Sequence, residues 1–122
     1  MSDRRQRLGR WGEVLAAQYL AAQGYTIVDQ NVRTKYGEID IIACQPDETL
    51  VFVEVKTRRG TVFGPPEVSV NTVKKSHLLA SIQSYLVDHP NIIAGYRLDV
   101  IAIQFRADDQ PPEIFHFENA IS

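Results

Sequence analysis

The spacing of apolar residues changes several times along the chain, and each change marks a new element. Between Trp11 and Gln23 apolar and small side chains recur at helical spacing, and Gly24 follows as a C-cap, which predicts a helix over residues 10–23. A second helix is predicted from Asn71, a suitable N-cap, to Asp88, ahead of Pro90. Five short apolar runs predict strands, over residues 25–32, 38–44, 50–57, 96–105 and 113–117.

This order of elements, αβββαββ, predicts an α/β domain with a mixed central sheet flanked by helices. We expect one domain over residues 1–122, with residues 1–8 as a mobile basic N-terminus. Residues 45–49 read as the loop of a hairpin that joins the second and third strands.

Composition adds mild constraints on the class of protein. The chain is 44% hydrophobic and 23% charged, which is typical of a soluble globular protein. It shows no apolar run of membrane-spanning length and no signal-peptide core at its start. Its single cysteine, Cys44, lies in an apolar run and reads as a small hydrophobe rather than a catalytic thiol. These features favour a cytoplasmic protein without a membrane partner.

Charges inside two of the predicted strands are the strongest chemical signal. Asp40 lies within Gly37–Ala43, and Glu54 and Lys56 lie within Leu50–Lys56. Charges in a buried strand are costly unless they are paired or bind a metal. Across a hairpin the strands lie about 4.8 Å apart, so Asp40 and Glu54 are expected to approach each other. Two carboxylates at that separation require a proton or a cation between them.

These residues suggest a site for phosphodiester hydrolysis. Oxygen ligands from Asp40 and Glu54, with the Val55 carbonyl as a further ligand, suit Mg²⁺ or Mn²⁺. Lys56 is then expected to orient or deprotonate the attacking water, or to stabilise charge in the transition state. The alternative is a structural ion pair between Lys56 and one of the acids.

Glu13 is the only charged residue between Trp11 and Gln23, and helical periodicity turns it toward the apolar face. A favourable helix dipole explains an acid in the first turn but not its inward direction. From periodicity alone, a structural and a functional role for Glu13 are equally supported. In a functional site it would hold a second metal or an outer-shell water.

Basic residues flank the acids although the formal net charge is −2. Arg33, Lys35, Arg58, Lys74 and Lys75 follow or precede the acid-bearing strands, as a surface that tracks phosphates requires. Taken one at a time, each is better explained as a solvated surface charge. Asp99, in an apolar strand, is expected to pair structurally with Arg97 or another cation.

Several short motifs are spread along most of the chain: Gly12–Glu13, Asn31–Arg33, Gly37–Ala43, Val51–Arg58, Phe63–Gly64, Lys74 and Arg97–Ile101. Together these motifs resemble the YraN-like family of small bacterial proteins. That family is similar to archaeal Holliday-junction resolvases and to the restriction-endonuclease-like PD-(D/E)xK nucleases. Ile39 stands where the proline of that signature is expected, at a position that varies widely.

The resemblance implies a restriction-endonuclease-like fold with an αβββαβ core. It also implies that Glu13, Asp40, Glu54 and Lys56 are catalytic, with Mg²⁺ or Mn²⁺ as cofactor. Lys74 is expected to contact DNA phosphate or the active site, and Arg33 and Arg58 to contact phosphate. Phe63 is the favoured aromatic for substrate contact.

Three functions fit the sequence. The first is a metal-dependent endonuclease acting on DNA rather than RNA, on branched or damaged substrates, and as a homodimer if two strands are cut symmetrically. The second is a nucleic-acid-binding module with little catalysis of its own. The third is a protein in which the acids and Lys56 form only a structural ion-pair cluster.

Overall fold

The computed structural model describes residues 3–60, 72–92, 95–106 and 110–120, with the side chains of 3–5 and 72–74 left out of the description. Within these ranges the elements follow one another as α1 (Asp3–Ala22), β1 (Thr26–Thr34), β2 (Gly37–Cys44), β3 (Leu50–Arg59), α2 (Thr72–Asp88), β4 (Tyr96–Phe105) and β5 (Glu113–Phe117). This is the predicted α/β fold class, compatible with a restriction-endonuclease-like core.

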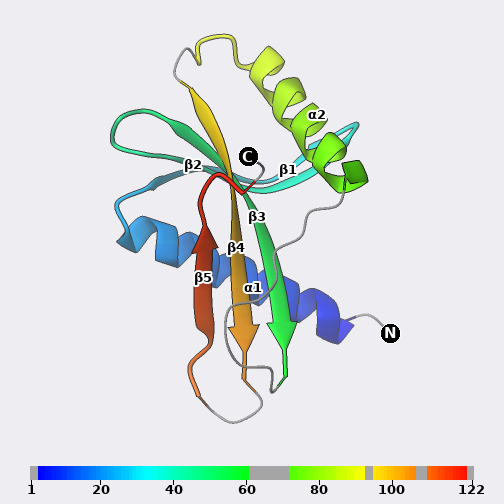
Figure 1. Ribbon diagram of the computed structural model, residues 1–122, viewed down its shortest axis with the longest axis vertical. Helices are drawn as coiled ribbons and strands as arrows, with labels where there is room; N and C mark the ends of the chain where they lie inside the picture. The colour runs from blue at the N-terminus through cyan, green and yellow to red at the C-terminus, as the bar shows by residue number, and fades with distance from the viewer. Residues whose placement is uncertain (1–2, 61–71, 93–94, 107–109, 121–122) are drawn as a thin grey trace.

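All five described strands form one sheet in the order β1-β2-β3-β4-β5. Neighbouring strands are antiparallel except β3 and β4, which are parallel from Leu50–Tyr96 to Arg59–Phe105. A parallel pair needs a crossover connection, and α2 lies within it. In Figure 1, α1 runs across the sheet while α2 lies over the β1–β2 hairpin.

The two helices cover opposite faces of the sheet and bury separate apolar clusters. The cluster under α1 contains Ala16, Leu20, Ile41, Ala43, Val51, Val53, Ile101 and Ile103. The cluster under α2 contains Ile39, Ile42, Leu50, Phe52, Leu78, Ile82, Tyr85 and Leu98. Strict alternation accounts for β3, where Val51 and Phe52 face opposite helices. It breaks in β2, because Ile39 and Ile42 pack in the same cluster.

Helix α1 ends as predicted but begins earlier. Gly24 has φ +96°, a conformation that suits glycine. The N–H of the next residue, Tyr25, donates to the Leu20 carbonyl in the last turn of the helix. The helix starts at Asp3 rather than at residue 10, so residues 3–8 belong to it rather than to a separate N-terminal segment. Neither helix is long and apolar enough to cross a membrane, in the part of the chain that is described.

Two residues expected in loops or caps lie outside the described residues. Phe63, the predicted substrate-contacting aromatic, and Asn71, the predicted N-cap of the second helix, belong to the segment 61–71. Cys44 is half-buried and packs beside the α2 cluster, in agreement with its prediction as a small hydrophobe.

Close contact between α1 and β3 depends on Gly12. A Cβ atom at this position would lie 1.9 Å from Thr57 Cγ2 and 3.8 Å from Ile103 Cγ1. Thr57 is β-branched and its χ1 is stiff, so it cannot easily move aside. Gly12 therefore lets the helix backbone approach the strand, and this approach sets the position of the adjacent Glu13.

We predict that Gly12→Ala lowers the free energy of unfolding by about 1–3 kcal/mol through overpacking. Gly9→Ala is the matched control on the same helix, because its Cβ would meet nothing within 4 Å. That control should be neutral or raise stability by up to about 1 kcal/mol through helix propensity. Urea unfolding of both variants measures the difference. Equal stabilisation by the two alanines would contradict the close contact.

Candidate functional site

Strands β2 and β3 separate at the predicted acids. Their paired positions run from Cys44–Leu50 to Ile41–Val53, and one further step would place Asp40 opposite Glu54. Beyond that point β2 stays paired with β1, through Val32–Ile39 to Thr34–Gly37. The acid-bearing ends of β2 and β3 therefore form a fork in the sheet.

Asp40 lies in this fork and replaces a backbone hydrogen-bond partner with its side chain. The Val55 N–H donates to Asp40 Oδ2 over 2.8 Å. The N–H and C=O of one residue in an extended strand point to the same side, so the Val55 carbonyl also faces the fork. This orientation is compatible with the Val55 carbonyl as an oxygen ligand, which stays a prediction.

Glu54 and Asp40 line the same cavity between the sheet and α2. The cavity has a volume of about 230 Å³, and its acidic lining also includes Glu38. Glu54 is only 8% exposed, so its carboxyl group is largely shielded from bulk water. Apolar walls come from Phe52 on β3 and Leu78 on α2. Charged groups beside apolar walls interact with one another more strongly than in water, because the local dielectric constant is lower.

The negative groups disfavour one another's charged forms. Burial raises the pKa of Asp40 to about 7, the charges of Glu13, Glu54 and Glu38 act in the same direction, and the Val55 N–H opposes them. The pKa of Glu13 is also raised, by burial and then by Glu38. Such crowding is relieved by a proton or by a bound cation.

Glu13 joins the cluster from α1, which lies on the opposite face of the sheet. It is half-buried, as its helical periodicity predicts. Asn31 holds it in place: with the amide nitrogen turned toward the acids, Asn31 donates to Glu13 Oε1 over 2.8 Å and to Glu38 Oε1 over 3.1 Å. The bond from Asn31 lowers the pKa of Glu13 against the effect of burial.

Asn31 has an unusual backbone for a strand residue. Its φ is +52°, in the left-handed region where asparagine is enriched among non-glycine residues. Backbone strain of this kind gathers at functional sites. The sequence motif contained Asn31 without indicating its role. A strand-disfavoured asparagine within a predicted strand was the available signal.

Three other residues of the site were not found from the sequence. Glu38 lines the cavity, and His77 and Ser81 line it from α2. The side chains at 77 and 81 are one helical turn apart, so they share a face of α2. Sequence alone could not select this helix face, because the selection depends on where the β1–β2 hairpin meets α2.

The predicted cations are placed unevenly. Lys56 follows Glu54 by two positions in β3 and is half-buried. Arg33 is 88% exposed in its side chain and forms an ion pair of 3.6 Å with Glu38. Arg58 is exposed near the end of β3. Lys74 lies in α2, but its side chain is among those not described.

The donor set of the acid cluster fits a hard cation. It offers carboxylate oxygens and a backbone carbonyl, and Mg²⁺ is commonly held by one or two carboxylates while keeping several waters. Among the described residues, the one group of three His, Cys, Asp or Glu ligands within 4.8 Å of one another lies elsewhere. Glu13, Asp40 and Glu54 therefore interact electrostatically without closing into a tight three-ligand cage.

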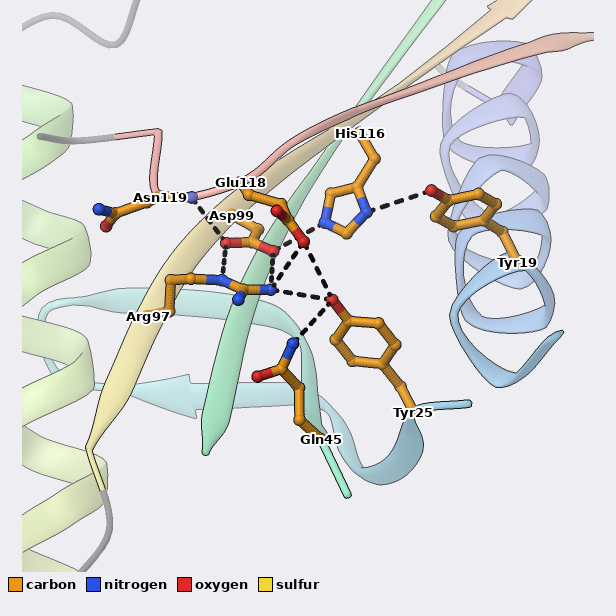
Figure 2. A network of polar contacts seen from close by, with 8 residues as sticks. All are labelled: Tyr19, Tyr25, Gln45, Arg97, Asp99, His116, Glu118 and Asn119. Carbon is orange, nitrogen blue, oxygen red and sulfur yellow. Dashed lines mark hydrogen bonds and ion pairs between the residues drawn. The ribbon is translucent and has the colours of Figure 1, made fainter. Parts of the chain in front are cut away.

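That other group, Asp99, His116 and Glu118, belongs to a network around the buried Asp99 that Figure 2 shows. Arg97 binds Asp99 in a bidentate manner, with Nε 2.8 Å from Oδ1 and Nη2 3.0 Å from Oδ2. His116 Nε2 lies 2.7 Å from Oδ2, and the Asn119 N–H donates to Oδ1 over 2.9 Å. Both oxygens of the fully buried Asp99 thus have two partners each.

The network ties distant segments to the centre of the sheet. Arg97 Nη2 donates to the Tyr25 hydroxyl over 2.9 Å and forms an ion pair of 3.4 Å with Glu118. Tyr19 on α1 lies 3.2 Å from His116 Nδ1. Burial pushes the pKa of Asp99 upward, but the hydrogen bonds from His116 and Arg97 bring it below its ordinary value. The Arg97 guanidinium supplies the positive charge that balances the Asp99 carboxylate. The two hydrogen bonds between them confirm the predicted Arg97–Asp99 pairing.

Removing Arg97 should therefore be costly. We predict that Arg97→Met lowers the free energy of unfolding by about 3 kcal/mol, because it leaves a buried carboxylate with less compensation. Arg33→Met is the matched control, since its ion pair with Glu38 is exposed and should contribute less than about 1 kcal/mol. Urea unfolding compares the two. Equal losses would show that burial does not determine the contribution of these pairs.

Crowding at Asp40 predicts a dependence of stability on pH. The carboxyl pKa of unfolded Asp is near 3.9. Between about pH 4 and the folded value of about 7, the folded protein retains a proton that the unfolded chain has lost. The free energy of unfolding therefore falls as pH rises through this window. In EDTA, Asp40→Asn should raise the melting temperature at pH 8 and change it little near pH 4.5.

The exposed Asp29→Asn, on neighbouring β1, is the control and should show no such difference between the two pH values. Adding Mg²⁺ at pH 8 should then stabilise the wild-type protein more than Asp40→Asn, because a cation relieves the repulsion. A lower melting temperature of Asp40→Asn at pH 8 would mean that a fixed cation already compensates this carboxylate.

Comparison with known proteins finds relatives of this chain across the region that carries the acid cluster. The model of "Uncharacterised protein family UPF0102" matches residues 12–103, which include Glu13, Asp40 and Glu54. A UPF0102 protein of Syntrophomonas wolfei is 44% identical over 94% of this chain and 97% of its own length. One of Syntrophotalea carbinolica is 44% identical over 98% and 95%, respectively. The chain therefore belongs to the uncharacterised family UPF0102, the YraN family that its motifs resemble.

Proposed function

We propose that this protein is a metal-dependent nuclease that hydrolyses phosphodiester bonds in DNA. The observation that carries the proposal is the sheet fork, where Asp40 and Glu54 line one cavity and the pKa of Asp40 is raised to about 7. A structural ion-pair cluster would compensate its acids, whereas this one leaves Asp40 electrostatically strained. Strain of this kind at a cavity is typical of sites that bind a cation or move protons.

Each residue has a distinct role in this proposal. Asp40, Glu54 and the Val55 carbonyl would hold Mg²⁺ or Mn²⁺, with Glu13 as a further or outer ligand held by Asn31. The ion supplies polarisation of the phosphoryl oxygen and a lower pKa for the attacking water. Lys56 would place positive charge beside the reacting phosphate and orient the water.

The substrate is a polyanion, and basic residues surround the acids to receive it. Arg33 stands exposed on β1 in the β1–β2 hairpin, and Arg58 is exposed near the end of β3. In sequence, Arg33 precedes Asp40 and Arg58 follows Glu54. Phosphate contacts of this kind make binding depend steeply on salt.

We predict that Glu54→Gln abolishes Mg²⁺- or Mn²⁺-dependent cleavage of labelled flap, junction, single-stranded and duplex DNA. The neutral amide is a poor ligand for a hard cation, and the loss should exceed about 100-fold in rate. Glu48→Gln is the control, because Glu48 is exposed in the loop of the same β2–β3 hairpin. It should cleave like the wild type. Undiminished cleavage by Glu54→Gln would refute the assignment.

Lys56→Met separates catalysis from folding in the same assay. It should leave the melting temperature and DNA affinity nearly unchanged and reduce the cleavage rate by about 100-fold or more. An unfolded variant would instead favour the structural ion pair as the role of Lys56. DNA binding without cleavage by the wild-type protein on every substrate would favour a binding module.

A further inference from the structure

The turn between β1 and β2 is fixed against α2 by hydrogen bonds. Thr34 Oγ1 donates to the Gly37 carbonyl over 2.9 Å and lies 3.0 Å from Ser81 Oγ, and the Tyr36 N–H donates to Thr34 Oγ1 over 3.1 Å. Ser81 is 1% exposed. A polar side chain buried at this point connects the turn to the helix, so the turn has a defined position.

The turn presents an aromatic ring and a cation at the protein surface. Tyr36 is 43% exposed, one of the few large hydrophobic side chains left so open among the described residues. Lys35 Nζ lies 5.1 Å from the centroid of the Tyr36 ring. A positive charge beside an accessible ring is the combination that proteins use to hold a base and its phosphate.

Lys35 and Tyr36 line a surface hollow of about 490 Å³ against α2. Its other walls, Ala80, Gln83, Ser84, Val87 and Asp88, all come from α2. The lining therefore combines small, apolar and polar side chains of the helix with the ring and the cation of the hairpin. The hollow is large enough for a nucleobase, and Lys35 is the one positive charge among its lining residues, so a phosphate is expected at Lys35.

Residues adjacent in sequence line this hollow and the acid cavity. Tyr36 lines the hollow, while the next residue, Gly37, lines the acid cavity with Asp40 and Glu54. Ser81 lines the acid cavity, and its neighbour Ala80 lines the hollow. One turn of backbone therefore lies between the proposed cleavage site and the exposed ring.

We propose that Lys35 and Tyr36 form a subsite for an unpaired nucleotide close to the scissile phosphate. Tyr36 stacks on the face of the base, and Lys35 contacts its phosphate. In a duplex the base faces are covered by their neighbours, so an aromatic platform is used only where bases are unstacked. The subsite makes DNA with single-stranded arms the preferred substrate over intact duplex. The inference rests on the proposed nuclease function.

The test measures binding of two fluorescent DNAs of the same sequence, a fork with unpaired arms and a blunt duplex. Proteins carry Glu54→Gln so that binding is observed with Mg²⁺ without cleavage. Tyr36→Ala should weaken binding of the fork roughly 5- to 100-fold, as expected for loss of base stacking, and that of the duplex less than about 2-fold. Tyr36→Trp should restore fork binding. Lys35→Ala should weaken both through a lost phosphate contact.

Trp11→Ala is the matched control, since Trp11 is an exposed aromatic on α1, 52% accessible and outside both cavities. It should bind both DNAs like the parent. Ultraviolet cross-linking of a fork with 5-iodouracil in its arm should join the DNA to Tyr36. Unchanged fork binding by Tyr36→Ala, or loss of fork binding by Trp11→Ala instead, would overturn the subsite.

Cleavage assays of the protein without Glu54→Gln separate the two levels of the proposal. If the wild type cleaves DNA but Tyr36→Ala cleaves forks and duplexes with the wild-type ratio, the subsite is wrong and the nuclease stands. If the wild type neither cleaves nor binds any of these DNAs, the subsite and the nuclease function are both overturned.

Discussion

The hydrogen bond from the Val55 N–H to Asp40 Oδ2 is the contact on which the site depends. A strand that leaves its neighbour exposes backbone groups, and buried N–H groups without a partner are costly. Asp40 satisfies the Val55 N–H with its side chain, so β2 can leave β3 while β3 stays in the sheet. The same carboxylate is thereby drawn into the fork beside Glu54. Asp40 therefore both satisfies the Val55 N–H and contributes a carboxylate to the fork.

The negative charges of Asp99 and Asp40 have different surroundings in this small domain. Asp99 has two partners on each oxygen and an arginine beside it, so its pKa lies below the ordinary value. Burial, and then three nearby carboxylates, raise the pKa of Asp40 against the opposing effect of the Val55 N–H. The first arrangement stabilises the fold, and the second stores electrostatic strain. Electrostatic strain at a cavity is typical of sites that bind a cation or move protons, and this contrast supports the proposed role of the acid cavity.

Local pattern predicted most of the fold, and it predicted the acids that line the cavity, whose roles stay predictions. Alternation in β3 placed Glu54 on the face of the sheet away from the α1 cluster. Gly24 ended α1 where it was expected. The start of α1 was missed because Asp3 and the arginines after it carry no apolar periodicity. Asn31, His77 and Ser81 were missed for another reason. Their roles come from contacts between segments far apart in sequence, which a one-dimensional pattern does not contain.

The Thr34–Ser81 contact would connect the proposed nucleotide subsite with the proposed catalytic acids. Thr34 and Gly37 border the turn that carries Tyr36, and the strand continues from Gly37 through Glu38 to Asp40. A Cβ at Gly37, where φ is +148°, would lie 3.4 Å from Ser81 Oγ, so the turn fits closely against α2. A nucleotide held on Tyr36, as proposed, would therefore be positioned relative to Asp40 through only a few residues of paired strand. Short connections of this kind transmit little positional error, which is what orientation of a scissile bond requires.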